Sequence, residues 1–273
     1  MTRWVPGHQA IGRAHSEVEL HGGTANRGRV HRVGNTVRRP LRPTAPATHA
    51  LLRYLEEVGF DGVPRVLGID EQGREVLSYI PGEAVIAPAP AWGLTDDALR
   101  SFGALLRRFH DAAAGFNTHG YRWPDSAPPP FHRGGMTHND PNLDNVVFRD
   151  GRAVALIDFD LAAPGAPLWD LAGAARFWVP LRVPSDTTDG RRHRELERLR
   201  ILVDAYGLDE ERRGQFTAAA LGHHDWMYGI VADGARGGVP GFAAYWTPTT
   251  IERAGRARAW LTAHADAIAH ALA

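Results

Sequence analysis

The chain contains neither cysteine nor lysine. Without cysteine it can form no disulfide bond and no thiolate metal site, as is usual for cytoplasmic proteins, and we expect a cytoplasmic location. Its 31 basic residues are balanced by 31 acidic residues, so the net charge favours neither nucleic acid nor a membrane surface as a partner. No apolar run approaches the length of a membrane helix, and residues 1–6 lack the apolar stretch of a secretory signal. We therefore predict a soluble protein without nucleic-acid or membrane partners.

A polar motif lies in the middle of the chain. His138, Asp140 and Asn145 form the pattern H-x-D-x-x-x-x-N. An apolar strand, an Asp-Gly turn and a returning apolar strand follow, and Asp158 comes directly after them. Because the two strands form a hairpin, Asp158 returns to the end of the ribbon where Asn145 lies. The sequence thus brings together one proton acceptor and two oxygen ligands for a hard cation. The alternative is a polar loop with a turn-forming Asn-Asp-Pro.

Such a set suits phosphoryl transfer, in which the protein positions the nucleophile and holds Mg²⁺ against the phosphates. We expect Asp140 to orient the hydroxyl of the acceptor and to receive its proton. Asn145 and Asp158 are the expected magnesium ligands. Two protein ligands suffice, because water and phosphate oxygens complete the octahedron of Mg²⁺.

Three segments carry a resemblance to a known family: residues 138–145, residues 157–160 and Pro-Leu-Trp-Asp-Leu-Ala at 167–172. In this order and spacing they resemble the catalytic region of the aminoglycoside phosphotransferase and choline kinase-like family, relatives of the protein kinases. One departure is Asn139, where the family usually has Gly or Ser.

The resemblance implies an α+β, two-lobed protein kinase-like fold. Residues 1–83 would form a small nucleotide-binding lobe, an antiparallel sheet with one helix that ends in a hinge, and residues 84–273 a mainly helical lobe with the catalytic loop and acceptor pocket. It also implies an enzyme that moves the γ-phosphate of ATP, or of GTP, to a small-molecule hydroxyl with Mg²⁺ as cofactor. His138 and Asp170 would support the catalytic loop, although Asp170 is also a plausible N-cap of the helix that follows.

A glycine-rich segment at residues 21–28 precedes a strand near the start of the chain. Glycine lets backbone N–H groups approach phosphate oxygens, and a nearby hydroxyl or amide adds a side-chain donor. The expected phosphate contacts are Gly22, Gly23, Thr24 and Asn26. An ordinary β-turn is the alternative.

The strand at residues 36–39 should carry the cation that holds the nucleotide phosphates, normally a lysine in such folds. Arginine can replace it, because the guanidinium binds phosphate oxygens in a bidentate manner. By alternation Thr36 and Arg38 share a face, so we assign Arg38 to the phosphates and Arg39 to solvent. Two surface arginines on an edge strand are the alternative. Similar proteins pair this cation with a glutamate of the next helix, where the nearest counterpart here is His49.

Ser78, Tyr79 and Ile80 end a second predicted hairpin. In the resembling family this strand leads into the hinge, where backbone groups bind the adenine edge, so these residues are expected beside the base. A plain edge strand is the alternative.

Three helices are expected after residue 185, at about 191–206, 209–231 and 248–272, with a mobile glycine-rich loop at 234–241. They should wall the acceptor pocket, for which the candidates are Asp225, Trp226, Tyr228 and Asp233. A metal site at His223, His224 and Asp225 is disfavoured, since adjacent helical positions point about 100° apart. The sequence does not identify the acceptor or the oligomeric state.

Two other functions compete with a kinase. Asp158 and Asp160 follow an apolar strand as the nucleophile and acid of an aspartyl-phosphate hydrolase would, but Ala162 replaces the expected hydroxyl and no lysine follows. The second alternative is a catalytically weak, nucleotide-binding scaffold, which the missing lysine and helix glutamate suggest. The presence of both Asp140 and Asp158 favours the kinase.

Overall fold

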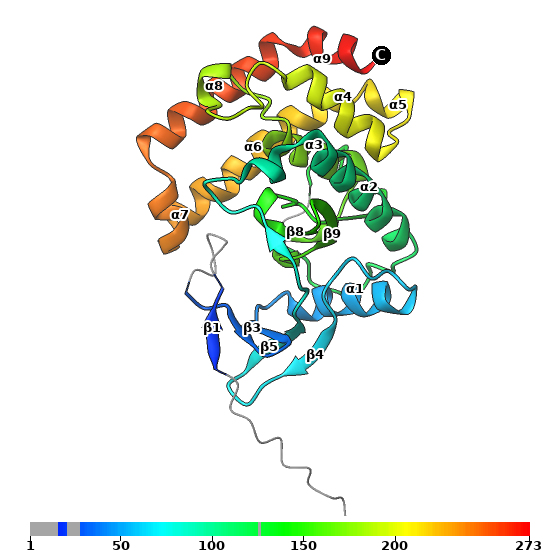
Figure 1. The fold of residues 1–273 in the computed structure, drawn as a ribbon, viewed down its shortest axis with the longest axis vertical. Coiled ribbons are helices and arrows are strands. Elements are labelled where there is room, and N and C mark those ends of the chain that lie inside the picture. The colour runs from blue at the N-terminus through cyan, green and yellow to red at the C-terminus, as the bar shows by residue number, and fades with distance from the viewer. Residues whose placement is uncertain (1–15, 21–27, 125–126) are drawn as a thin grey trace, which may run out of the picture.

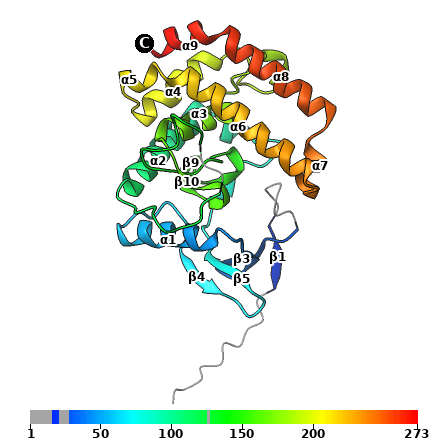
Figure 2. The ribbon, with the colours of Figure 1, turned by 180° about the vertical axis from the view of Figure 1, so that it is seen from behind.

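The chain forms two lobes, as the computed structural model of residues 16–20, 28–124 and 127–273 shows (Figure 1). A small antiparallel sheet with one helix lies at one end, and a larger, mainly helical lobe lies beyond it. Seen from behind, the helix α1 (Ala45–Glu57) lies between the small sheet and the strands of the larger lobe (Figure 2). The predicted α+β fold is confirmed.

The sheet of the small lobe has the strand order β1-β2-β3-β5-β4, and all its pairings are antiparallel. Its strands are β1 (Glu17–Glu19), β2 (His31–Val33), β3 (Thr36–Pro40), β4 (Val66–Ile69) and β5 (Arg74–Ser78). Helix α1 buries Leu51, Leu52 and Leu55 in the core. These three positions recur at helical spacing, which is why one face of α1 is apolar.

The larger lobe is built around the long helix α2 (Asp96–Ala113) and a three-stranded sheet. Thr95 caps α2 by accepting a hydrogen bond from the Ala98 N–H, as its sequence predicts. Leu99, Phe102, Leu106 and Phe109 form its buried face. The sheet has the order β6-β8-β9, with strands β6 (Glu83–Ala84), β8 (Val146–Arg149) and β9 (Arg152–Leu156). Because β6 pairs with β8, the chain has joined the larger lobe by residue 83.

The remaining elements complete the larger lobe. They are η1 (Ala91–Leu94), β7 (Met136–Thr137), η2 (Leu143–Asn145), η3 (Phe159–Leu161), β10 (Ala163–Pro164), α3 (Pro167–Trp178), η4 (Pro184–Asp186), α4 (Glu195–Tyr206), α5 (Glu210–Arg213), α6 (Phe216–Arg236), α7 (Pro240–Tyr245), α8 (Pro248–Ala263) and α9 (Ala265–Leu272). No helix in the described residues has the length and apolar character needed to cross a membrane.

The C-terminal region differs from the three expected helices. The second of them is divided into α5 and α6 at residues 214–215, and the third into α8 and α9 at His264. The expected loop at 234–241 is wrong, because α6 continues to Arg236 and α7 begins at Pro240. Proline suits the first turn of a helix, where its missing N–H would have no partner.

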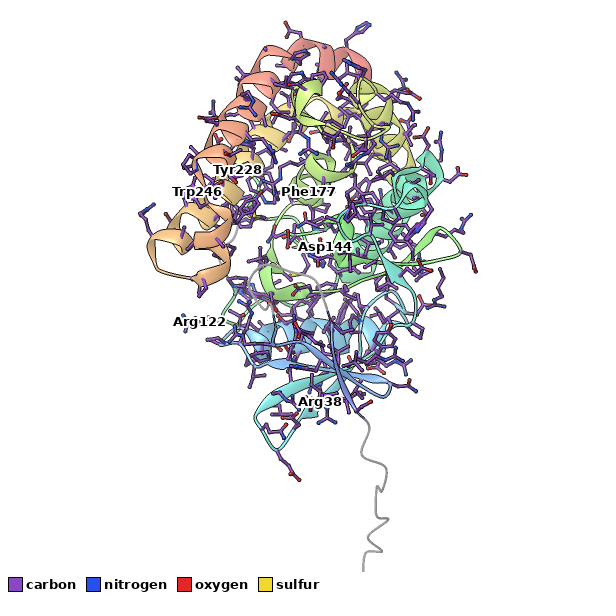
Figure 3. All side chains as sticks on the ribbon, turned by 60° about the vertical axis from the view of Figure 1, so that its left-hand side comes forward. Arg38, Arg122, Asp144, Phe177, Tyr228 and Trp246 are labelled. Carbon is purple, nitrogen blue, oxygen red and sulfur yellow. The ribbon has the colours of Figure 1, made fainter. Side chains whose placement is uncertain are left out.

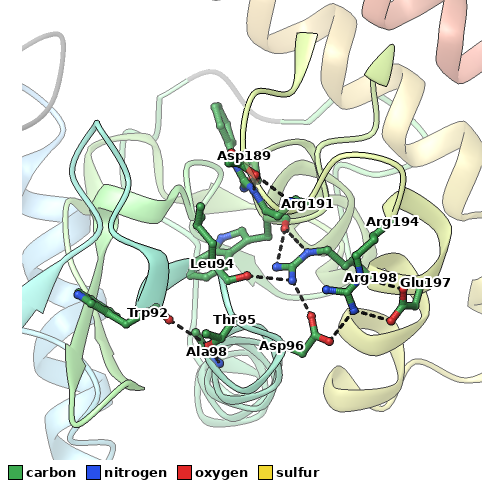
Figure 4. A network of polar contacts seen from close by, with 12 residues as sticks. Trp92, Leu94, Thr95, Asp96, Ala98, Asp189, Arg191, Arg194, Glu197 and Arg198 are labelled. Atoms are coloured by element: carbon green, nitrogen blue, oxygen red, sulfur yellow. Dashed lines mark hydrogen bonds and ion pairs between the residues drawn. The ribbon is translucent and has the colours of Figure 1, made fainter. Parts of the chain in front are cut away.

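A buried arginine ties three helices together behind the catalytic loop (Figure 4). Arg198 of α4 donates to the carbonyl of Leu94, 3.0 Å away, and to the carbonyl of Trp178, 3.2 Å away. It also pairs with Asp96, which lies 2.7 Å away in the first turn of α2. The Trp178 indole in turn donates to the Pro141 carbonyl at 2.9 Å. This chain of contacts holds the backbone next to Asp140.

Candidate active site

Asp170 of α3 anchors the loop that follows β7. Its carboxylate accepts the backbone N–H groups of His138 and Asn139, each at 2.7 Å, and it also contacts His110 Nε2 at 3.0 Å. Burial alone would raise the pKa of Asp170, but the hydrogen bond and charge of His110, with the contacts of His138, lower it overall. Asp170 therefore remains an ionised acceptor within the fold. Its geometry is that of a brace for the loop.

His138 connects the same loop to the segment that carries Asp158. Its Nε2 lies 2.9 Å from the Ile157 carbonyl, and its Nδ1 accepts the Asp140 N–H at 3.3 Å. Burial lowers the pKa of this fully enclosed imidazole, so it is neutral. Since Nδ1 accepts, the proton resides on Nε2. His138 thereby positions the loop and the strand end relative to each other.

Asp140 projects from this loop and is held by two amide side chains. Asn142 Nδ2 donates to Oδ1 at 2.6 Å, and Asn145 Nδ2 donates to Oδ2 at 3.1 Å. Burial, followed by the charges of Asp158 and Asp144, raises the pKa of Asp140 well above that of an ordinary aspartate. A carboxylate with a raised pKa is a stronger base. The side chain is therefore both oriented and chemically suited to accept a proton.

Asn145 and Asp158 lie at neighbouring strand ends, since the Ile157 N–H donates to the Asn145 carbonyl at 2.9 Å. Asn145 Nδ2 also donates to the Asp140 carbonyl, 2.8 Å away, which leaves the amide oxygen of Asn145 as the atom for a cation. Asp158 adopts a left-handed backbone, with φ of 63°, that turns its carboxylate out of the strand direction. One carboxylate oxygen contacts Arg39, and no bond to the other is present among the described residues. These hard oxygen donors fit Mg²⁺.

Arg39 reaches the site from β3 and contacts three carboxylates. Its Nε lies 2.6 Å from Glu75 Oε1, its Nη1 2.8 Å from Asp158 Oδ1, and its Nη2 2.9 Å from Asp160 Oδ1. Burial alone would lower the pKa of Arg39, but the three carboxylates raise it, so the guanidinium stays charged. The cation of the small lobe thus adjoins Asp158, one of the expected metal ligands.

The expected orientation of the two arginines is therefore wrong. Arg39, assigned to solvent, is only 6 % exposed. Arg38 pairs with Asp70 at 3.1 Å on the other face of the sheet, beside a hollow lined by Leu67, Ile69 and Gln72. The physical reason is that Val37 and Arg39 face the same way as the buried Leu77 and Glu75 of the adjacent strand.

The acid that contacts Arg39 is Glu75 of β5 rather than a glutamate of α1. It is directly opposite Arg39 in the β3–β5 register, and its other oxygen, Oε2, contacts His49 Nε2 of α1 at 2.8 Å. His49 thus holds the acid rather than the cation. Asp160 pairs with Arg39 at 2.9 Å and with Arg42 at 2.6 Å.

The remaining nucleotide contacts are placed as follows. Gly22, Gly23, Thr24 and Asn26 lie outside the described residues, although the β1–β2 pairing on either side of them is present. The N–H groups of Ser78 and Tyr79 donate to the Arg65 and Asn35 carbonyls, both at 2.9 Å. Of the three expected hinge residues, only Ile80 has an N–H without such a bond in the described part of the chain.

Of the four expected acceptor-pocket residues, Tyr228 lies next to Arg176, whose charge acts on Asp140. Asp225 is bound by Arg258 of α8 at 2.8 Å, and Asp233 pairs with Arg236 on the surface. Trp226 packs against Trp169, with ring centres 5.8 Å apart. Tyr228 instead packs against Trp246, with ring centres 5.9 Å apart, and both lie on the side of the larger lobe that faces Asp144 (Figure 3).

Arg176 of α3, which was not predicted as a site residue, lies between this aromatic pair and the catalytic loop. Its guanidinium carbon is 5.0 Å from the centre of the Tyr228 ring and 4.3 Å from that of Phe177. Its charge acts on Asp140, whose pKa it lowers against the larger effects of burial and of Asp158. The sequence did offer one signal: Arg176 lies in the same helix as Asp170, less than two turns after it.

Comparisons with known proteins agree with this geometry. A family model described as "Phosphotransferase enzyme family" matches residues 119–214. The chain is 36 % identical over 211 residues to a trifolitoxin immunity protein of Rhizobium leguminosarum bv. trifolii, covering 74 % of this chain and 78 % of that protein.

Solved structures show the same fold. A choline/ethanolamine kinase family protein from Mesorhizobium loti has a TM-score of 0.62 at 18 % identity, covering 97 % of this chain and 94 % of that one. The GDP complex of aminoglycoside 2'-phosphotransferase-IIIa has a TM-score of 0.60 at 14 % identity, covering 92 % and 95 %. A choline kinase from Cryptosporidium parvum Iowa II has a TM-score of 0.59 at 12 % identity, covering 98 % and 94 %. The predicted enzyme class, a phosphotransferase, is confirmed, and the chain belongs to the phosphotransferase enzyme family.

Proposed function

We propose that the protein transfers the γ-phosphate of ATP, or of GTP, to a hydroxyl group of a small molecule. The observation that carries the proposal is the convergence of Asp140, Asn145 and Asp158: the Asn145 side chain donates to Asp140, and the N–H of Ile157, next to Asp158, donates to the Asn145 carbonyl. A base, an amide oxygen and a carboxylate are the groups that phosphoryl transfer requires at one place. We also propose a cytoplasmic location, where the nucleotide is supplied.

In this mechanism Asp140 receives the proton of the acceptor hydroxyl as that oxygen attacks the γ-phosphorus. Asn142 and Asn145 hold the carboxylate in one orientation, so little rearrangement is needed when the acceptor binds. Asn145 and Asp158 would hold Mg²⁺, which neutralises the phosphate charge when bound.

Arg39 takes the place of Arg38 as the proposed phosphate cation. Its guanidinium is fixed by Glu75, which His49 holds in turn, so the fork is already oriented before a nucleotide binds. Nucleotide phosphates would contact the nitrogens that now reach Asp158 and Asp160. Gly22, Gly23, Thr24 and Asn26 remain proposed phosphate contacts, and the backbone at Ile80 a proposed contact of the base.

A coupled nucleotide-consumption assay with a panel of hydroxylated metabolites and antibiotics tests the proposal. Asp140→Ala should lower acceptor-dependent turnover by about 10²–10⁴-fold and leave nucleotide binding intact, because the base acts only in transfer. Asp158→Asn should weaken magnesium-dependent nucleotide binding as well. Asp150→Asn, in the turn between β8 and β9, is a matched control with full activity.

One result would contradict the kinase, and another would contradict the role of Asp140. Nucleotide binding without acceptor-dependent turnover in the wild type and in Asp140→Ala would favour the nucleotide-binding scaffold. Equal turnover by the wild type and Asp140→Ala would exclude Asp140 as the base.

A further inference from the structure

Arg176, whose charge acts on Asp140, and the neighbouring Arg182 form no ion pair among the described residues. Arg176 is at the end of α3, and its Nε and Nη1 are buried without a hydrogen-bond partner. Arg182 follows four residues after α3 and also has a buried Nε without a partner. In the part of the chain that the structure describes, no carboxylate forms an ion pair with either guanidinium. Buried polar nitrogens without partners are rare in folded proteins, and a bound ion or water is one explanation for them.

The two guanidinium groups act on each other. Burial, followed by the charges of Arg191 and Arg176, lowers the pKa of Arg182. Arg191 is itself neutralised, because it binds Asp189 at 2.8 Å. Arg176 and Arg182 are thus neighbouring positive charges, partly removed from water, and neither forms an ion pair among the described residues, although the charge of Asp189 partly offsets that of Arg182. An anion bound between them would remove this unfavourable arrangement.

The acidic residues of α6 are engaged elsewhere. Asp225 is held by Arg258 and His224, and Asp233 by Arg236. A pocket for a polycationic acceptor needs free carboxylates, and α6 supplies none among its described residues. The side of the lobe near Arg176 presents Phe177, Tyr228 and Trp246, which can pack against the uncharged part of an acceptor (Figure 3).

We propose that Arg176 and Arg182 bind an anionic group of the acceptor, a carboxylate or a phosphate, while Asp140 faces its hydroxyl. The acceptor is therefore a hydroxylated acid rather than a cationic amine. Calling the bound molecule the acceptor rests on the proposed function, whereas the anion site itself rests on the two unpaired arginines.

Isothermal titration calorimetry with simple probes tests the site. Malonate, inorganic phosphate and choline are each titrated into the full chain saturated with Mg²⁺ and a non-hydrolysable ATP analogue, so that nucleotide-phosphate contacts are already occupied. At least one anion should bind saturably and choline should not. The tighter anion distinguishes a carboxylate acceptor from a phosphorylated one.

Variants locate the binding. Arg176→Met and Arg182→Met should each weaken binding of the anion at least tenfold, since each removes a charged hydrogen-bond donor. Arg200→Met, which removes an exposed arginine of α4, should bind as the wild type does. If a methionine variant does not fold, the glutamine variant at the same position replaces it. No anion binding by the wild type, equal binding by the variants, or choline binding that these substitutions abolish would overturn the proposal.

The same samples separate this inference from the proposed function. If the nucleotide analogue binds but no anion does, the kinase assignment stands and the anionic acceptor is wrong. If an anion binds at the arginines but the nucleotide does not bind, the proposed function is wrong and the anion site stands.

Discussion

Arg39 and Glu75 face each other across adjacent strands, with Nε and Oε1 2.6 Å apart. Both are buried on the inner face of the small sheet. Because the acid comes from a strand paired with that of the arginine, the sheet itself maintains the ion pair. A movement of α1 would release His49 from Glu75 without separating Glu75 from Arg39. The cation is thus oriented by strand pairing rather than by helix position.

Arg39→Met should both destabilise the fold and abolish magnesium-dependent nucleotide binding. The change leaves the buried Glu75 without its cation, and removing one partner of a buried pair typically costs about 3–5 kcal/mol. Arg38→Met is the matched control. In Arg38→Met, Asp70 keeps its ion pair with Arg74, so the free energy of unfolding should fall by less than about 1 kcal/mol. Urea unfolding and nucleotide titration measure both quantities, and equal effects of the two substitutions would contradict the assignment.

Which of these two arginines is buried could not be predicted from the sequence. Alternation with a period of two places Arg38 and Arg39 on opposite faces, but it does not say which face is buried when both side chains are the same. The β4–β5 hairpin was predictable from its turn, whereas the β3–β5 pairing that joins Arg39 to Glu75 is between segments distant in the chain. The partner acid therefore could not be found by local rules.

The catalytic loop was more predictable because its geometry is local. His138, Asp140 and Asn145 lie within one loop, and a single hairpin returns Asp158 to them. The contacts that brace the loop come from α2 and α3, and the Asp170 brace was expected only through the family resemblance. The acceptor side depends on how α6 and α7 pack, which hydrophobic spacing alone does not determine.

Acceptor-dependent kcat/KM should fall at acidic pH because Asp140 must be ionised to accept a proton. Burial and the charges of Asp158 and Asp144 raise the pKa of Asp140, so the decrease begins at a higher pH than an ordinary aspartate would give. Asp144→Asn removes one of the two acidic neighbours and should move this acidic limb to lower pH. Rates across the acidic range, at one magnesium concentration, check the prediction, and a limb that stays in place would contradict it.

Asp140→Asn should stabilise the protein at neutral pH. A group with a raised pKa in the fold binds its proton more tightly there than in the unfolded chain, so its ionisation at higher pH disfavours the fold. An asparagine removes that penalty. The gain in the free energy of unfolding should therefore be present above the folded pKa of Asp140 and disappear as pH falls below 3.8, the ordinary value. Thermal unfolding at a series of pH values checks the sign, and a gain that persists in acid would contradict this explanation.

Asp170→Asn should destabilise the fold by about 3 kcal/mol or more. The carboxylate accepts two backbone N–H groups and contacts His110, and each hydrogen bond to a charged group contributes about 1.5–3 kcal/mol. Because the pKa of Asp170 is lowered in the fold, its contribution is present above the unfolded value and is lost as pH falls through the folded one. Urea unfolding should therefore show a smaller acid-induced loss of stability in the variant. Asp97→Asn, in the exposed first turn of α2, should change little.

Gly173→Ala should weaken the packing between α3 and α6. A β-carbon at position 173 would lie 2.2 Å from His223 Nε2, and the imidazole is confined by Trp169, with ring centres 5.1 Å apart. Alanine favours a helix over glycine by about 1 kcal/mol, but overpacking of a core costs about 1–3 kcal/mol and should prevail.

A double-mutant cycle separates this overlap from other effects of the two substitutions. In Gly173→Ala/His223→Ala the new methyl group occupies space that the imidazole has left, so the double variant should be more stable than the sum of the single losses predicts. Burial lowers the pKa of His223 to about 3, so the imidazole is neutral at pH 7 and its removal changes no charge. Any coupling in the urea unfolding free energies then reports packing alone, and strictly additive losses would show that overlap with His223 is not the cause of the Gly173→Ala loss.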